Sequence, residues 1–70
     1  MDIELAIKTA LDFENRVVKV YEEAAAATQD PDGKKMFEVL AREERSHVKY
    51  LEAKLEEWKK SGGAGRSVGR

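Results

Sequence analysis

Two rows of mainly apolar residues, each with the alternating three-and-four spacing of a helix face, constrain the fold of this chain more than any other feature. The first row is Ile3, Ile7, Ala10, Glu14, Val17, Tyr21, Ala24 and Thr28. The second is Phe37, Leu40, Glu44, His47, Leu51 and Trp58, with Met36, Ala41, Val48 and Leu55 beside it. This spacing places the members of a row on one side of an α-helix. The sequence therefore predicts two amphipathic helices.

A short polar segment separates the two rows. Asp30 can cap a helix, Pro31 suits the first helical position, and Asp32 complements the positive end of a helix. No residue before this segment breaks a helix, so we expect one helix over about residues 3–28 and a second over about residues 31–60.

The composition changes after the second helix, where Ser61-Gly62-Gly63 is expected to stop it. We expect one helical domain over residues 1–60 and a flexible Gly/Ser/Arg tail over residues 61–70, because such a tail cannot bury enough apolar surface to order itself. A length of 70 residues, with 41% hydrophobic and 39% charged, is typical of one small amphipathic helical domain.

The short connection makes the two helices antiparallel neighbours, so the position of a residue along the hairpin follows from its number of residues from the connection. Glu14 lies about as many residues before the connection as Glu44 and His47 lie after it, which places all three at one level. A buried polar group without a partner costs ~2–7 kcal/mol, and a metal ion accepts both carboxylate and imidazole ligands. The pattern predicts a metal site at Glu14, Glu44 and His47.

One hairpin supplies only half of such a site and leaves its apolar stripe uncovered. A second copy, related by a two-fold axis perpendicular to the helices, would cover the stripe and double the ligands to four carboxylates and two imidazoles, suited to two divalent ions. The expected fold class is therefore all-α: an antiparallel helical hairpin that forms a homodimeric four-helix bundle.

The same residues allow a non-catalytic interpretation. His47 could be a hydrogen-bonded core histidine, and Glu14 could pair with Arg45 or Lys49 across the hairpin. The buried polar groups would then only set the register of a helical association module. Tyr21, two turns nearer the connection than Glu14, could hydrogen-bond to a ligand carboxylate or simply pack.

Composition narrows the functional classes further. The chain has no cysteine, so it has no disulfide and no thiolate metal site. Its 13 basic and 14 acidic residues give a net charge of -1 without a basic stripe, so we expect no nucleic-acid partner. The first residues include acids and no long apolar run, from which we expect no secretory signal, no membrane span and a cytoplasmic location. The exterior carboxylates Glu22, Glu23, Glu43, Glu56 and Glu57 are expected to be solvated.

The placement of one Glu on the first helix and Glu-x-x-His on the second resembles the ferritin-like di-iron carboxylate superfamily. The run from Phe37 to His47, F-E-V-L-A-R-E-E-R-S-H, is similar to the corresponding rubrerythrin run. With a single helix pair, the chain looks most like the half-size encapsulated ferritins, whose ferroxidase site forms between two subunits.

This resemblance implies a ferroxidase that oxidises Fe(II) to Fe(III) for iron storage or detoxification, with two iron ions per dimer and Mn²⁺ or Zn²⁺ as substitutes. It implies that Glu44 bridges the metals, that Glu14 and His47 complete each one, and that Tyr21 lies just outside the ligands. It also implies a ring of dimers as cargo of an encapsulin shell, inside an encapsulin nanocompartment. The rubrerythrin side of the resemblance implies peroxide or oxygen scavenging with an external electron donor instead.

The chain also departs from these families. Val17 is apolar where rubrerythrins carry a further Glu, which favours a symmetric site. Phe13, Arg16 and Val20 do not reproduce the acidic, aromatic-lined outer site of encapsulated ferritins. The segment 65–70 is only faintly similar to a shell-targeting peptide.

Overall fold

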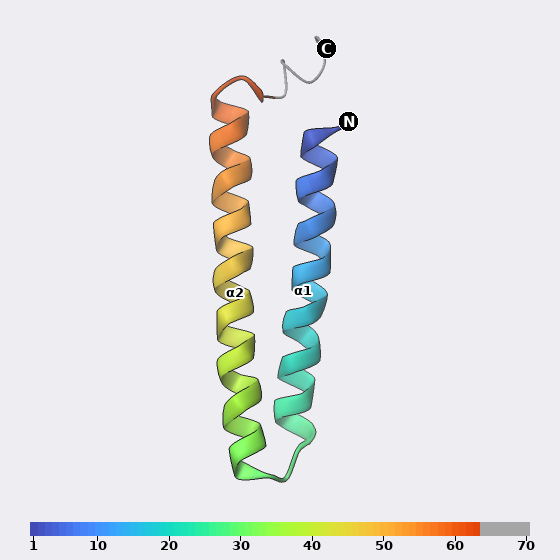
Figure 1. Ribbon diagram of the computed structural model, residues 1–70, viewed down its shortest axis with the longest axis vertical. Coiled ribbons are helices and arrows are strands. Elements are labelled where there is room, and N and C mark those ends of the chain that lie inside the picture. The colour runs from blue at the N-terminus through green and yellow to red at the C-terminus, as the bar shows by residue number, and fades with distance from the viewer. Residues whose placement is uncertain (64–70) are drawn as a thin grey trace.

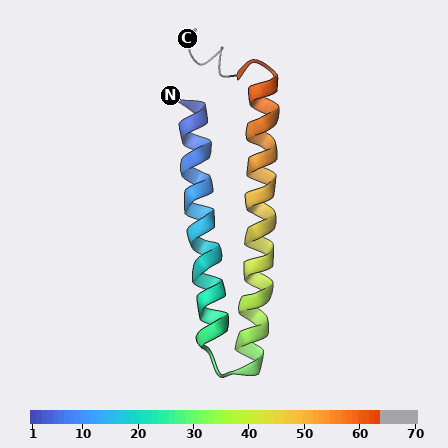
Figure 2. The ribbon, with the colours of Figure 1, turned by 180° about the vertical axis from the view of Figure 1, so that it is seen from behind.

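The computed structural model describes residues 1–63 and shows two antiparallel helices joined by a short turn (Figure 1). Helix α1 spans Ile3–Ala27 and helix α2 spans Pro31–Lys60. α1 ends one residue before the expected limit, and α2 has the expected limits. Seen from behind, the helices again run side by side along their length (Figure 2). The prediction of an all-α helical hairpin is confirmed.

Both helices begin at an aspartate cap. The Asp2 side chain accepts a hydrogen bond from the Leu5 N–H at 3.0 Å, and Asp30 accepts one from the Asp32 N–H at 3.3 Å. α1 has no basic residue in its last turn, but the Lys34 ammonium donates to the Ala25 carbonyl oxygen at 3.2 Å. The first turn of α2 therefore supplies the cation that the negative end of α1 favours.

The end of α2 differs from the expectation of a flexible tail beginning at residue 61. Ser61 caps the helix, and Gly62 adopts a left-handed conformation with φ of 84°. Gly63 is buried against Trp58, so closely that a Cβ atom at Gly63 would overlap the indole ring. Residues 61–63 thus form a packed turn. The rest of the expected tail, with its shell-targeting prediction, lies outside the described residues.

Apart from Gly63, the buried residues of the described chain form a narrow strip between the two helices. We call it the inner seam, and it consists of Val18 and Ala25 from α1 and Ala41 and Leu55 from α2. Small residues at two of these four positions let the helices approach closely. No charged side chain within residues 1–63 is buried.

The two predicted rows lie mostly beside this seam, where they are half-buried. We call their apolar part the open face: Ile7, Val17, Tyr21 and Ala24 of α1, and Phe37, Leu40, Leu51 and Trp58 of α2. A hairpin covers each helix from one direction only, so one flank of each row contacts the other helix while the opposite flank meets solvent.

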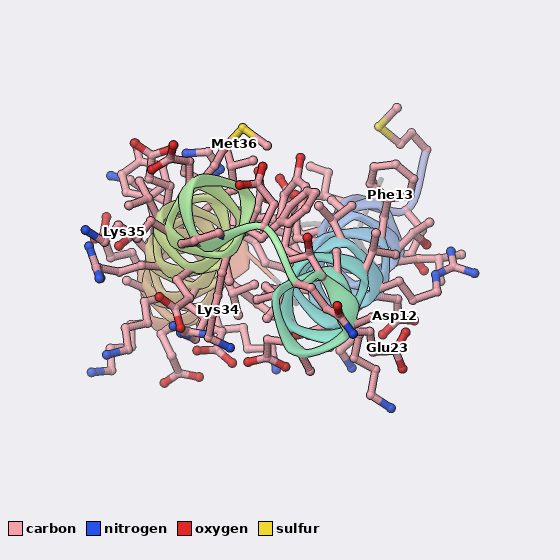
Figure 3. All side chains as sticks on the ribbon, turned by 90° about the horizontal axis from the view of Figure 1, so that it is seen from below. Asp12, Phe13, Glu23, Lys34, Lys35 and Met36 are labelled. Carbon is pink, nitrogen blue, oxygen red and sulfur yellow. The ribbon has the colours of Figure 1, made fainter. Side chains whose placement is uncertain are left out.

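Large apolar side chains also mark the outer margin of each row. The α1 margin carries Phe13 and Val20, 60% and 59% exposed, and the α2 margin carries Met36 and Tyr50, 52% and 62% exposed. Figure 3 shows Met36 and Phe13 on the same side of the hairpin, one from each helix, whereas Lys34 points to the opposite side. The margins therefore flank the open face. Within residues 1–63, neither helix has an apolar stretch long enough to cross a bilayer.

Candidate metal centre

The structure brings together the three residues that the sequence singles out. Glu14 lies in α1, and Glu44 and His47 lie one helical turn apart in α2. One ligand atom from each residue lies within 4.8 Å of the other two. Metal–oxygen and metal–nitrogen bonds of roughly 2.0–2.2 Å hold two ligand atoms on one ion at most about 4.4 Å apart, so at most a small inward movement of these side chains would bring all three to one ion. The antiparallel register of the hairpin creates this convergence.

The three side chains differ in exposure. Glu14 and Glu44 are half-buried, and the Glu44 side chain is only 19% exposed. His47 differs from the expectation of a residue enclosed in the apolar row, because its side chain is 60% exposed. It lies on the edge of the row that turns toward the α2 margin, where the hairpin alone does not cover it.

The Glu44 carboxylate contains the one buried side-chain oxygen or nitrogen in residues 1–63 that lacks a hydrogen-bond partner, its Oε2 atom. The Nδ1 atom of His47 is 3.6 Å away, which is beyond hydrogen-bonding distance. Unpartnered buried polar atoms are rare and costly, so this oxygen requires an explanation. A proton on the neighbouring Glu14 carboxyl or a bound cation would supply the missing partner.

The electrostatics of the Glu14 and Glu44 carboxyl groups also favours a bound cation. The pKa of Glu14 is raised above its ordinary value of 4.5, chiefly by hydrogen bonding of its protonated form to Glu44. Desolvation and repulsion from the Glu44 charge raise this pKa further, and His47 opposes them. Ionisation of both carboxyl groups is therefore unfavourable, and a bound divalent ion would compensate the repulsion between their charges.

The alternative ion pairs of Glu14, with Arg45 or Lys49, do not form among residues 1–63. Arg45 pairs with Glu22 instead, at 2.8 Å, and both side chains are about half exposed. Lys49 makes no ion pair with Glu14 in the described part of the chain. The carboxylate of Glu14 is thus left to Glu44 and His47.

Tyr21 packs in the hairpin. Its ring stacks on Phe37, with centroids 6.4 Å apart and planes inclined by 25°. Within residues 1–63 its hydroxyl makes no hydrogen bond to the three site residues, so a role beside the ligands stays a prediction.

The five exterior glutamates expected to be solvated are all exposed. Two of them have cationic partners, Glu22 with Arg45 and Glu57 with Lys54. No further carboxylate or imidazole joins the group in the part of the chain that the structure describes. Three donors from one chain leave the coordination of most divalent ions incomplete.

Comparison with protein-family models, curated proteins and solved structures finds no match to this chain. The case for a metal centre therefore rests on the geometry and chemistry of Glu14, Glu44 and His47.

Proposed function

We propose that two copies of this hairpin pack through their open faces and form a centre that binds two iron ions and oxidises Fe(II) to Fe(III). The observation that carries this proposal is the buried, unpartnered Oε2 atom of Glu44 beside the Glu14 carboxyl and the His47 imidazole. A buried carboxylate oxygen without a hydrogen-bond partner is suited to bind a cation. The open face supplies the reason for a second copy, since it leaves eight apolar residues half-covered.

Two copies would provide two each of Glu14, Glu44 and His47. The four carboxylates carry four negative charges, which two divalent ions balance. Glu44, whose side chain is 19% exposed, would be the ligand that the two ions share, and Glu14 and His47 would each bind one. A set of oxygen and nitrogen donors without sulfur suits iron, and Mn²⁺ or Zn²⁺ as substitutes.

Bound Fe(II) supplies the electrons for the oxidation and keeps coordination positions for an oxidant such as dioxygen or peroxide. The residues contribute charge and enclosure. Anionic carboxylates favour the higher charge of Fe(III) over Fe(II), and this preference is strongest where apolar neighbours such as Leu40 and Leu51 keep water away. Iron storage or detoxification is the role that such an oxidation would serve. Assembly into a ring and an encapsulin shell as partner stay further predictions.

The test is an anaerobic titration with Fe(II), followed by admission of oxygen. We expect about one iron ion per chain, two per dimer, and oxidation much faster than in buffer. Glu44→Ala should lose both properties, because each ion would lack its shared ligand. Glu56→Ala is the matched control, since Glu56 is an exposed carboxylate on α2, away from the site.

Wild-type oxidation no faster than in buffer would overturn the ferroxidase proposal. If the protein nevertheless binds metal at this stoichiometry, the centre binds metal without oxidising it. If it associates but binds no metal, the chain is a helical association module.

A further inference from the structure

The two margins of the open face differ in chemistry at the level of the metal centre. On α1, the residue next to Glu14 is Phe13, which is 60% exposed, and Val20 lies two turns further on. On α2, Glu43 is next to Glu44 and lies four residues, about one turn, before His47 on the same side of the helix. The α1 margin is apolar at this level, and the α2 margin is polar and acidic.

Glu43 is a free carboxylate. It is exposed and makes no ion pair with any of residues 1–63. Spacing of seven residues places it on one stripe with Met36 and Tyr50, which define the α2 margin. The nearest lysine on that margin, Lys54, is engaged elsewhere: it contacts Glu57 at 3.4 Å and lies 5.4 Å from the centre of the Tyr50 ring.

His47 marks the same side of the site as accessible. It is the one member of the site that is exposed, whereas Glu14 and Glu44 are half-buried. An ion that approaches over the α2 margin would meet Glu43, then His47, then the enclosed oxygens. An ion that approaches over the α1 margin would meet the Phe13 ring and, one turn beyond it, the Arg16 cation.

From this asymmetry we infer that divalent cations reach the metal centre over the α2 margin, guided by the Glu43 carboxylate, and not over the α1 margin. The inference rests on the proposed function, because a second copy would cover the open face and leave the margins in contact with solvent. Glu43 acts here as a steering residue and not as a ligand. Its charge attracts a divalent cation and raises the local cation concentration.

The test is the rate of Co²⁺ binding, followed by its visible absorption in stopped-flow at low ionic strength. Glu43→Gln should slow binding roughly three- to tenfold, as expected for loss of one charge several ångströms from a divalent ion. It should leave the number of ions bound per chain unchanged, and the difference from wild type should shrink as salt is added. Glu56→Gln is the matched control on the same helix and should bind at the wild-type rate.

Phe13→Ala tests the other margin and should also leave the rate unchanged. A faster rate in Phe13→Ala, or equal rates in Glu43→Gln and Glu56→Gln, would overturn the inferred route. A loss of bound ions in Glu43→Gln would also overturn it, since Glu43 would then be a ligand. Wild-type protein that binds no Co²⁺ and no Fe(II) would instead refute the proposed centre itself.

Discussion

The inner seam and the open face are both built from apolar residues, but the inner seam is buried and the open face is only half-buried. Val18, Ala25, Ala41 and Leu55 exclude water by packing one helix on the other. The open face has larger side chains, including Trp58, but the hairpin covers it only from the side. The ionisable site lies on the uncovered face. The difference shows that pairing two helices buries four apolar residues and leaves eight others, together with the polar site, only partly covered.

The strongest test of the difference between the two regions is to place a charge on the open face. Leu51→Glu should prevent association, because covering an unpaired carboxylate costs more than the ~2–7 kcal/mol of an unpartnered neutral polar group. Light scattering over a range of protein concentrations measures the loss. Tyr50→Glu is the control, since Tyr50 is the neighbouring residue but is 62% exposed on the margin. Equal association of the two variants would mean that the open face is not an interface.

A truncation in the inner seam should act on the hairpin itself. Leu55→Ala should lower the free energy of unfolding by about 2–5 kcal/mol, because Leu55 is 8% exposed and its loss leaves a cavity. Denaturant unfolding followed by circular dichroism measures this loss. Met36→Ala, at a position 52% exposed, should cost much less. Similar losses in the two variants would show that burial in the hairpin does not set stability.

Metal should strengthen the contact between open faces. An ion that binds the dimer but not the separate hairpin stabilises association by about 2.7 kcal/mol when free metal is one hundred times its dissociation constant. Light scattering with Fe(II) or Zn²⁺ added and then chelated should show association rise and fall. Glu14→Ala should lose this response. Wild-type association that is indifferent to metal would rule out a site shared between copies.

The metal-free protein should reveal the carboxyl pair through its pH dependence. The pKa of Glu14 is raised in the folded state, so its contribution to stability is complete below the ordinary value of 4.5 and is lost as pH rises through the raised pKa. Thermal unfolding from about pH 4 to about pH 8 should show wild type losing stability relative to Glu14→Gln. The Glu4 group, whose pKa Lys8 and Lys59 lower, is common to both proteins and cancels. A difference of opposite sign would mean that folding lowers the pKa of Glu14 and would contradict the repulsive carboxyl pair.

The smallest effect is expected on the exterior of the hairpin. Arg45→Gln removes the 2.8 Å ion pair with Glu22, but both side chains are about half exposed and solvent screens the pair. The cost should be less than about 1 kcal/mol. Denaturant unfolding of this variant beside Lys49→Gln checks the value. A cost as large as that of Leu55→Ala would show that the hairpin depends on this ion pair as much as on the packing of Leu55.

The sequence predicts the parts of this structure that depend on local chemistry. Asp30 and Pro31 determine where α2 begins, and Gly62 is suited to end it because its φ is positive. Residue counting from the turn predicts that Glu14 meets Glu44 and His47, since both helices rise by the same distance per residue.

Other features depend on the rotation of each helix about its axis, which spacing alone does not determine. The rows predict which residues share a face, but not that Val18 and Ala25, outside the first row, form the seam. For the same reason the exposure of His47 and the choice of Glu22 as partner of Arg45 could not be predicted. The packing of Gly63 on Trp58 depends on a backbone turn, and a glycine-rich composition does not specify one.

The packed turn at the end of α2 lies against a natural fluorescent probe, the side chain of Trp58. Trp58 is the single tryptophan of the chain, and it lies on the open face with Gly63 against its ring. It is fourteen residues from Glu44, or about 21 Å along the helix. Its fluorescence should therefore respond to the covering of the far end of the open face and only weakly to an ion bound at the centre. Emission and metal absorption recorded on one sample would separate the time course of assembly from that of metal binding.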